Sequence, residues 1–222
     1  MPGVLNQQYH QQRQRRIDFI YRLNRRTDEV KRIIAEQFNN YAGLNCLDIG
    51  TADGLMLGQL QKFFGFSKAI GIDMSQDLID ANQDPNIKLE LGDAENLRFE
   101  NNSFDVITAC AVIEHVNSPA QMLSECRRVL KQDGILVLTT PNPWLDKISE
   151  IIGYSSPDEH IETLTIAKLK ELFKQSNLRP IQTKYFMFFP FFKIPFENQF
   201  ESFLNLIGLE KAMCNQIIVG QK

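Results

Sequence analysis

The stretch Leu47-Asp48-Ile49-Gly50-Thr51-Ala52-Asp53-Gly54 carries more structural information than any other part of the 222-residue chain. An apolar run that is typical of a β-strand ends in a short turn of small residues, and a helical pattern begins at Leu55. Such a turn lets backbone N–H groups and a helix N-terminus come close to a ligand. We therefore expect a ligand to bind where this strand ends.

The rest of the chain alternates between strand-like and helix-like patterns. The predicted strands are 44–49, 68–72, 87–91, 104–109, 135–139, 181–189 and 216–220, and the predicted helices are 55–64, 76–81, 120–130 and 166–175. This alternation predicts an α/β fold with a parallel sheet built from crossover units. Strands that are apolar on both faces indicate helices on both sides of the sheet.

A carboxylate follows the second predicted strand. Asp73 lies 19 residues beyond Gly54, and an acid at this distance can accept hydrogen bonds from both ribose hydroxyls of an adenosine group. The alternative is structural, because Asp73 can also cap a helix that begins near Ser75. The turn and the acid together indicate a cofactor that contains adenosine.

The turn does not suit a dinucleotide. Residues 50–54 lack the G-x-G-x-x-G spacing that seats a pyrophosphate, which argues against a nicotinamide dehydrogenase. The carboxylate of Asp48 would repel a phosphate and attract an amino group. A cofactor with a cationic amino-acid end fits this loop better, and S-adenosylmethionine is such a cofactor.

The same loop carries a family resemblance. The chain resembles the class I S-adenosylmethionine-dependent methyltransferases of the small-molecule type, whose first motif is an acid followed by G-x-G-x-G. Ala52 replaces the middle glycine, and a methyl group is tolerated there if φ is negative. The cofactor loop is expected to comprise Asp48, Gly50, Thr51, Ala52, Asp53 and Gly54.

Further motifs match the family in the family's order. Asp73 matches its ribose-binding acid, and Met74 matches the residue beside the adenine. Asp93 matches the acid that accepts from the adenine amino group, Ala94 the residue whose backbone contacts the ring, and Cys110 a residue that lines the cofactor cleft. The resemblance covers about residues 44–140. It implies a Rossmann-like sheet of seven mostly parallel strands, with the last strand antiparallel and helices on both faces.

Residues 1–40 differ from the rest in composition. They contain eight Lys or Arg and four acids, a net charge of +4, so the remaining residues carry −7 of the chain's total of −3. Apolar side chains at Ile20, Leu23, Thr27, Val30, Ile34 and Phe38 follow helical spacing. We expect 1–40 to form an amphipathic helical extension and 41–222 to form the methyltransferase domain. The basic face is either solvated or gates an anionic or membrane-bound substrate.

Methyl transfer from a sulfonium is an in-line displacement in which positioning of the acceptor matters most. A base is needed only when the acceptor must lose a proton. His115 and then His160 are the candidates for a base or a substrate-orienting group, because both follow strands at the ligand-binding edge. The alternative is that each histidine only holds a loop in shape.

The sequence predicts no metal site. Glu114-His115 resembles the end of the metal-binding Glu-x-x-Glu-His of ubiquinone-biosynthesis O-methyltransferases, but Ala111 replaces the first glutamate. The four cysteines are widely scattered and show no metal-ligand spacing.

The acceptor is expected to bind under the segments 141–164 and 186–210. Half of the chain's sixteen phenylalanines lie in the second region: Phe186, Phe188, Phe189, Phe191, Phe192, Phe196, Phe200 and Phe203. Core packing is expected to account for about half of them. The others could cap an apolar acceptor, form a homodimer interface or touch a membrane as a peripheral contact. This cluster favours a small, hydrophobic or lipid-like acceptor.

Two other functions remain as alternatives. One is a protein or RNA methyltransferase, although a net charge of −3 and a pI of 5.7 argue against RNA and DNA partners. The other is a regulatory protein that binds S-adenosylmethionine without turnover. The chain has no stretch typical of a signal peptide or a membrane span, so a cytoplasmic location is expected.

Overall fold

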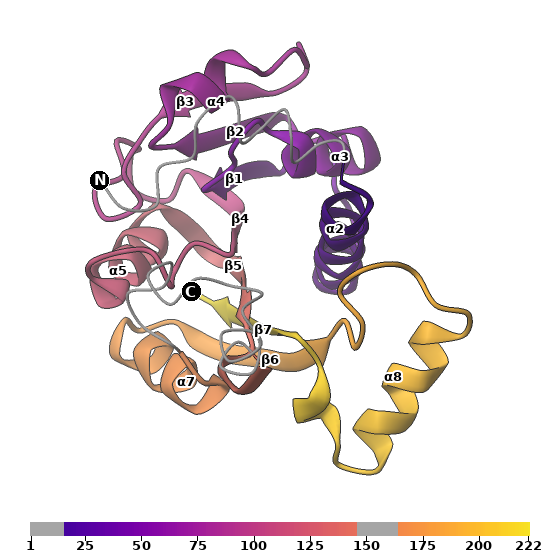
Figure 1. Ribbon diagram of the computed structural model, residues 1–222. Coiled ribbons are helices and arrows are strands. Elements are labelled where there is room, and N and C mark those ends of the chain that lie inside the picture. Colours follow the sequence, from indigo (N-terminus) through magenta and orange to yellow (C-terminus); the bar gives the residue numbers. More distant parts are fainter. Residues whose placement is uncertain (1–15, 146–163) are drawn as a thin grey trace.

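A seven-stranded sheet in the order β3-β2-β1-β4-β5-β7-β6 organises the chain (Figure 1). The computed structural model describes residues 16–145 and 164–222. The strands are β1 (Asn45–Ile49), β2 (Lys68–Asp73), β3 (Lys88–Leu91), β4 (Phe104–Cys110), β5 (Leu130–Pro141), β6 (Arg179–Phe186) and β7 (Asn215–Gln221). β7 runs antiparallel to β5 and β6, and the other pairs are parallel. The predicted Rossmann-like fold with one antiparallel last strand is confirmed.

The sheet has its reversal point between β1 and β4. The chain passes outward from β1 to β2 and β3, and then returns to pair β4 with the free side of β1. In open parallel sheets, ligands bind beyond the carboxyl ends of the strands at such a point. The loops that follow Ile49 and Cys110 therefore define the place where a ligand is expected.

Helices cover both faces of the sheet (Figure 1). They are α2 (Ile17–Gln37), α3 (Leu55–Phe64), α4 (Gln76–Asp80), α5 (Pro119–Val129), α7 (Ile166–Gln175) and α8 (Glu197–Leu206), with a 3-10 turn η2 (Glu210–Ala212). Alternate residues of each strand pack on opposite faces of the sheet, because successive strand side chains point in opposite directions. Ile107 packs in the cluster with α5 and α7, whereas Val106 packs in the cluster with α2 and α3.

Two strand boundaries differ from the sequence prediction by three residues or more, and the others agree within two. β5 begins at Leu130, which pairs with Phe104, and the register then shifts before Val106 pairs with Ile135. β6 ends at Phe186 instead of residue 189, because Met187 has a φ of 64° and turns the chain out of the strand. Both differences come from local backbone geometry that the apolar pattern does not encode.

The N-terminal helix α2 packs on the sheet through only part of its predicted apolar stripe. Val30, Ile33 and Ile34 are fully buried against the β4–β5–β7 face, whereas Ile20 is exposed. The earlier part of α2 instead contacts α8 through polar groups: Arg25 Nη2 donates to Glu201 Oε2 over 2.8 Å. α2 therefore joins the sheet to α8.

The phenylalanine-rich region is less buried than its composition suggests. Of its eight phenylalanines only Phe186 is fully buried, so the expectation that the core would take about half is wrong. Exposed members are Phe192, Phe196, Phe200 and Phe203.

Among the helices within 16–145 and 164–222, none has the length and apolar character needed to cross a bilayer.

Candidate functional site

The loop after β1 approaches its surroundings so closely that it needs glycine at two positions. Gly50 has a φ of 68°, and a Cβ atom there would lie 2.3 Å from Val112 Cγ2. Gly54 has a φ of 79°, and its Cβ would lie 2.6 Å from Ile87 Cδ1. The left-handed backbone and the lack of space both exclude a larger residue. The loop thus presents bare backbone at the carboxyl end of β1.

Ala52 departs from expectation. Its φ is +53°, so the condition under which a methyl group would be tolerated without strain, a negative φ, is not met. A left-handed backbone costs a residue with a Cβ about 1–2 kcal/mol, and a compensating contact holds it. The backbone N–H of Ala52 donates to Asp73 Oδ2 over 2.8 Å. The loop is therefore held in a strained shape by the acid at the end of β2.

Asp73 has a structural role at the ends of β1 and β2, close to the helix cap that was the alternative to ribose binding. Its Oδ1 accepts from the backbone N–H of Ser75, the N-cap residue of α4, over 2.9 Å, while its Oδ2 accepts from Ala52. Each carboxylate oxygen still has a second acceptor position, because a carboxylate has about four lone-pair sites. The ribose role of Asp73 stays a prediction that is compatible with these contacts.

Asp48 is buried with half of its carboxylate unpaired. Oδ1 accepts from Thr108 Oγ1 over 2.6 Å, whereas Oδ2 has no hydrogen-bond partner in the part of the chain that the structure describes. Burial raises the pKa of Asp48 from 3.8 to about 6, against the effect of the hydrogen bond from the Thr108 hydroxyl. A buried carboxylate in this state gains from a cationic partner.

Arg26 on α2 was not singled out from the sequence. It belongs to a group of charges around the Cys110 thiol at the end of β4. Burial raises the pKa of that thiol to about 12, while the charge of Arg26 lowers it and the charges of Asp48 and Glu114 raise it. Arg26 Nε is buried and has no hydrogen-bond partner among residues 16–145 and 164–222. A cation and a carboxylate, each with an unpaired atom, therefore lie near the same strand ends.

In the segment after β4, the neighbouring residues Glu114 and His115 differ in exposure. The Glu114 side chain is buried and His115 is exposed. The backbone N–H of His115 donates to the carbonyl oxygen of Val112 over 2.9 Å, so a tight turn follows β4. The role of His115 as a base stays a prediction, and His160 lies outside the described residues.

The predicted adenine-binding positions form the other end of the site. Met74 is exposed beyond β2, and Ala94 is buried after β3. Asp93 Oδ1 accepts from the backbone N–H of Glu95 over 2.8 Å. Glu95, which the sequence did not single out, links this loop to the start of α5, because its Oε1 accepts from the backbone N–H of Ser118 over 2.7 Å.

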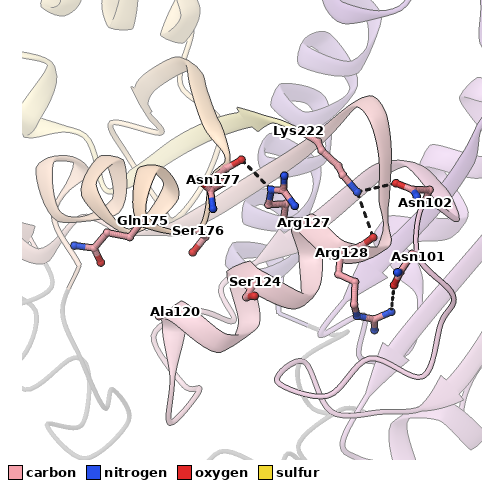
Figure 2. A pocket seen from close by; sticks show the side chains of 10 residues that line it. All are labelled: Asn101, Asn102, Ala120, Ser124, Arg127, Arg128, Gln175, Ser176, Asn177 and Lys222. Carbon is pink, nitrogen blue, oxygen red and sulfur yellow. Dashed lines mark hydrogen bonds between the residues drawn. The ribbon is translucent and has the colours of Figure 1, made fainter.

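The described residues also form two hollows, one away from the loop after β1 and one beside it. A pocket of about 460 Å³ lies near the amino ends of β4 and β6, away from the loop after β1 (Figure 2). It is lined by α5, by the residues that precede β4 and β6, and by Lys222 after β7. In Figure 2, Arg127 donates to Asn177, and Lys222 donates to Asn102. The second hollow, of about 1020 Å³, is lined by α3 and residues 80–86 and touches the loop at Asp53 and Gly54.

Comparison with known proteins agrees with this geometry. A family profile described as a methyltransferase domain matches residues 9–183. The chain belongs to the class I S-adenosylmethionine-dependent methyltransferases. The match includes the loop after β1, the acid after β2 and the segment after β4.

Curated relatives of this methyltransferase include ubiquinone biosynthesis O-methyltransferases. The protein of that name from Coxiella burnetii is 34% identical over 113 residues, which cover 48% of this chain and 47% of the relative. The one from Roseobacter denitrificans is 30% identical over 188 residues, which cover 74% and 75%. The chain thus spans about half the length of several relatives that it matches and three quarters of another.

Solved structures share the fold of this methyltransferase. A SAM-dependent methyltransferase from Archaeoglobus fulgidus superposes with a TM-score of 0.63 and 20% identity, over 88% of this chain and 94% of that one. At this level of identity the likeness concerns the fold alone.

Proposed function

We propose that this methyltransferase binds S-adenosylmethionine at the carboxyl ends of β1, β2 and β4 and methylates a small hydrophobic molecule. The observation that carries the proposal is the buried Asp48 Oδ2 atom, which has no hydrogen-bond partner within residues 16–145 and 164–222. Arg26 Nε is unpaired in the same part of the chain, and the charges of both residues act on the Cys110 thiol. A zwitterionic amino-acid end would supply an ammonium group to the first and a carboxylate to the second.

The remaining polar groups fit the rest of the same molecule. Asp73 would accept from the ribose hydroxyls with the acceptor positions that Ala52 and Ser75 leave open. Asp93 would accept from the adenine amino group. Gly50 and Gly54 let the loop pack closely against Val112 and Ile87, and they would leave its backbone bare toward the ligand. When bound, the cofactor supplies an electrophilic methyl group on a sulfonium.

The side chains at the strand ends favour transfer to a bound acceptor over reaction with the protein. Because burial raises the pKa of Cys110 to about 12, its thiol stays protonated at neutral pH and does not compete as a thiolate for the methyl group. The chain's main task is then to hold the acceptor in line and to exclude water. His115 at the rim would accept a proton from an acceptor that must lose one.

The acceptor class rests on the aromatic residues between β6 and α8. Phe189 makes edge-to-face contacts with Phe191 and Phe192, with ring centroids 5.2 and 4.9 Å apart. Such a group offers an apolar surface to an aromatic or lipid-like molecule. The relatives named ubiquinone biosynthesis O-methyltransferases support the same class of acceptor.

Calorimetry with S-adenosylmethionine, followed by transfer of a labelled methyl group to a panel of hydrophobic phenols and lipids, tests the proposal. Asp48→Asn should weaken cofactor binding, because the amide loses the negative charge that holds an ammonium group. Asp80→Asn, at an exposed position on α4, is the matched control and should bind as the wild type does. No binding by the wild-type chain would refute the cofactor assignment, and binding without any transfer would favour the regulatory alternative.

A further inference from the structure

Helix α8 buries two glutamates together with Leu204, and it exposes several large apolar side chains beside polar ones. Glu197 and Glu201 are 4% and 3% exposed, whereas Phe203 is 53% and Leu206 is 84% exposed. Phe196, at the N-cap position, is 77% exposed. A surface helix of a monomeric protein normally shows the reverse pattern. The apolar side of α8 therefore has to be explained by something that covers it.

Contacts with α2 fix this orientation. Arg25 Nη2 lies 2.8 Å from Glu201 Oε2, and Arg25 Nε lies 3.5 Å from Glu197 Oε1. The hydroxyl of Tyr21 also donates to Glu197. Turning the phenyl groups inward would require these buried charges to separate, at a high cost in free energy. The exposed apolar side is thus a stable feature of the fold.

The position of α8 suits contact with a flat surface. Figure 1 shows α8 and the connections on either side of it projecting from one corner of the molecule, away from the sheet. Exposed apolar side chains continue beyond both ends of the helix, at Phe192 before it and at Ile207 and Leu209 after it. A projecting helix with exposed apolar side chains can enter the headgroup region of a bilayer.

The charge of this region favours an anionic lipid surface. The only acids within 187–209 are Glu197 and Glu201, and both are buried in ion pairs with Arg25. Lys193 is exposed beside Phe192. The half-buried Glu210 that follows Leu209 is next to the exposed Lys211, so the exposed charge of residues 187–211 is positive overall and attracts anionic headgroups.

We propose that the apolar side of α8, together with Phe192, Phe196, Ile207 and Leu209, docks this protein on the surface of an anionic lipid bilayer. The helix lies in the plane of the interface and does not cross it, since α8 has only ten residues. The proposal does not depend on the cofactor site, because its residues lie outside the cofactor loops; only Phe192 is shared with the aromatic group proposed for the acceptor.

Co-sedimentation of the full chain with vesicles tests this inference. The wild type should bind vesicles of phosphatidylcholine and phosphatidylglycerol more tightly than vesicles of phosphatidylcholine alone. The double variant Phe203→Ser/Leu206→Ser should bind the mixed vesicles about tenfold or more weakly, because two large apolar side chains are removed. Phe63→Ser, on α3 at a 60% exposed position, is the matched control and should bind as the wild type does.

A charge variant and a measurement of size complete the test. Lys193→Glu should weaken binding to the mixed vesicles about fivefold or more and leave binding to phosphatidylcholine unchanged. The proposal is overturned if the wild type stays in the supernatant with both vesicles, if the double variant binds like the wild type, or if Lys193→Glu has no effect. It is also overturned if the wild type is a dimer that Phe203→Ser/Leu206→Ser converts to monomers, because the apolar side then joins two copies.

Discussion

The Asp73 carboxylate and the backbone of Ala52 are joined by a 2.8 Å hydrogen bond across the ends of β2 and β1. The acid that was predicted to bind ribose is therefore also the group that holds the cofactor loop in a left-handed turn. Changes at either residue should affect both the stability of the loop and its affinity for a ligand, and suitable variants can separate the two effects.

Replacing Asp73 by alanine should reduce both properties. Two charge-assisted bonds to backbone N–H groups are lost, which should lower the free energy of unfolding by about 2 kcal/mol at this half-buried position. Affinity for S-adenosylmethionine should fall at the same time. Asp73→Asn keeps one acceptor oxygen and should have intermediate stability. Urea unfolding and calorimetry measure the two quantities, and wild-type affinity in Asp73→Ala would refute the ribose assignment.

Replacing Ala52 by glycine should stabilise the protein. Glycine adopts a φ of +53° without steric cost, and the gain is partly offset by the larger backbone entropy of glycine in the unfolded chain. We expect a net increase of about 0.5–1 kcal/mol in the free energy of unfolding, with cofactor affinity preserved. Denaturant titration provides the measurement. A less stable variant would mean that the methyl group of Ala52 makes contacts that outweigh its strain.

Asp48 should make the free energy of unfolding of the ligand-free protein depend on pH. Because burial raises its pKa from 3.8 to about 6, the folded state holds a proton that the unfolded state releases between these values. The contribution of Asp48 to stability should therefore decrease as pH rises from about 4 to 6, by about 3 kcal/mol. Above pH 6 the Asp48→Asn variant should be more stable than the wild type.

The difference between the two unfolding curves isolates this effect, because the other carboxyl groups titrate in both proteins. Affinity for S-adenosylmethionine should show the opposite trend in the wild type and decrease below about pH 6, where Asp48 becomes protonated. Parallel unfolding profiles in the two proteins would contradict the raised pKa.

Replacing Arg26 should lower the affinity only for ligands that carry a carboxylate. Arg26→Met should lower the affinity for S-adenosylmethionine about tenfold or more, which corresponds to the loss of one charged hydrogen bond of about 1.5–3 kcal/mol. Affinity for adenosine, which has no carboxylate, should not change. Arg22→Met is the control, because Arg22 pairs with Asp18 on the same helix at 2.9 Å. An equal loss for both ligands would mean that Arg26 supports the fold and does not hold the carboxylate.

The sequence by itself determined the order of the elements and the position of the ligand-binding loop. The alternation of apolar runs, the small residues 50–54 and the acid at position 73 are local signals. They can be recognised along the chain because strand and helix periodicity and tight turns depend on neighbouring residues. The family resemblance rests on these same local patterns.

Only the tertiary structure decided which side chains meet across the site and which side of a helix is covered. Arg26 is one of eight basic residues in the first forty, and its place beside Cys110 depends on how α2 docks on β4 and β5. Likewise, α8 exposes its phenyl groups because Arg25, more than 170 positions earlier in the chain, holds its carboxylates. Such contacts depend on packing between distant segments, which no local pattern records.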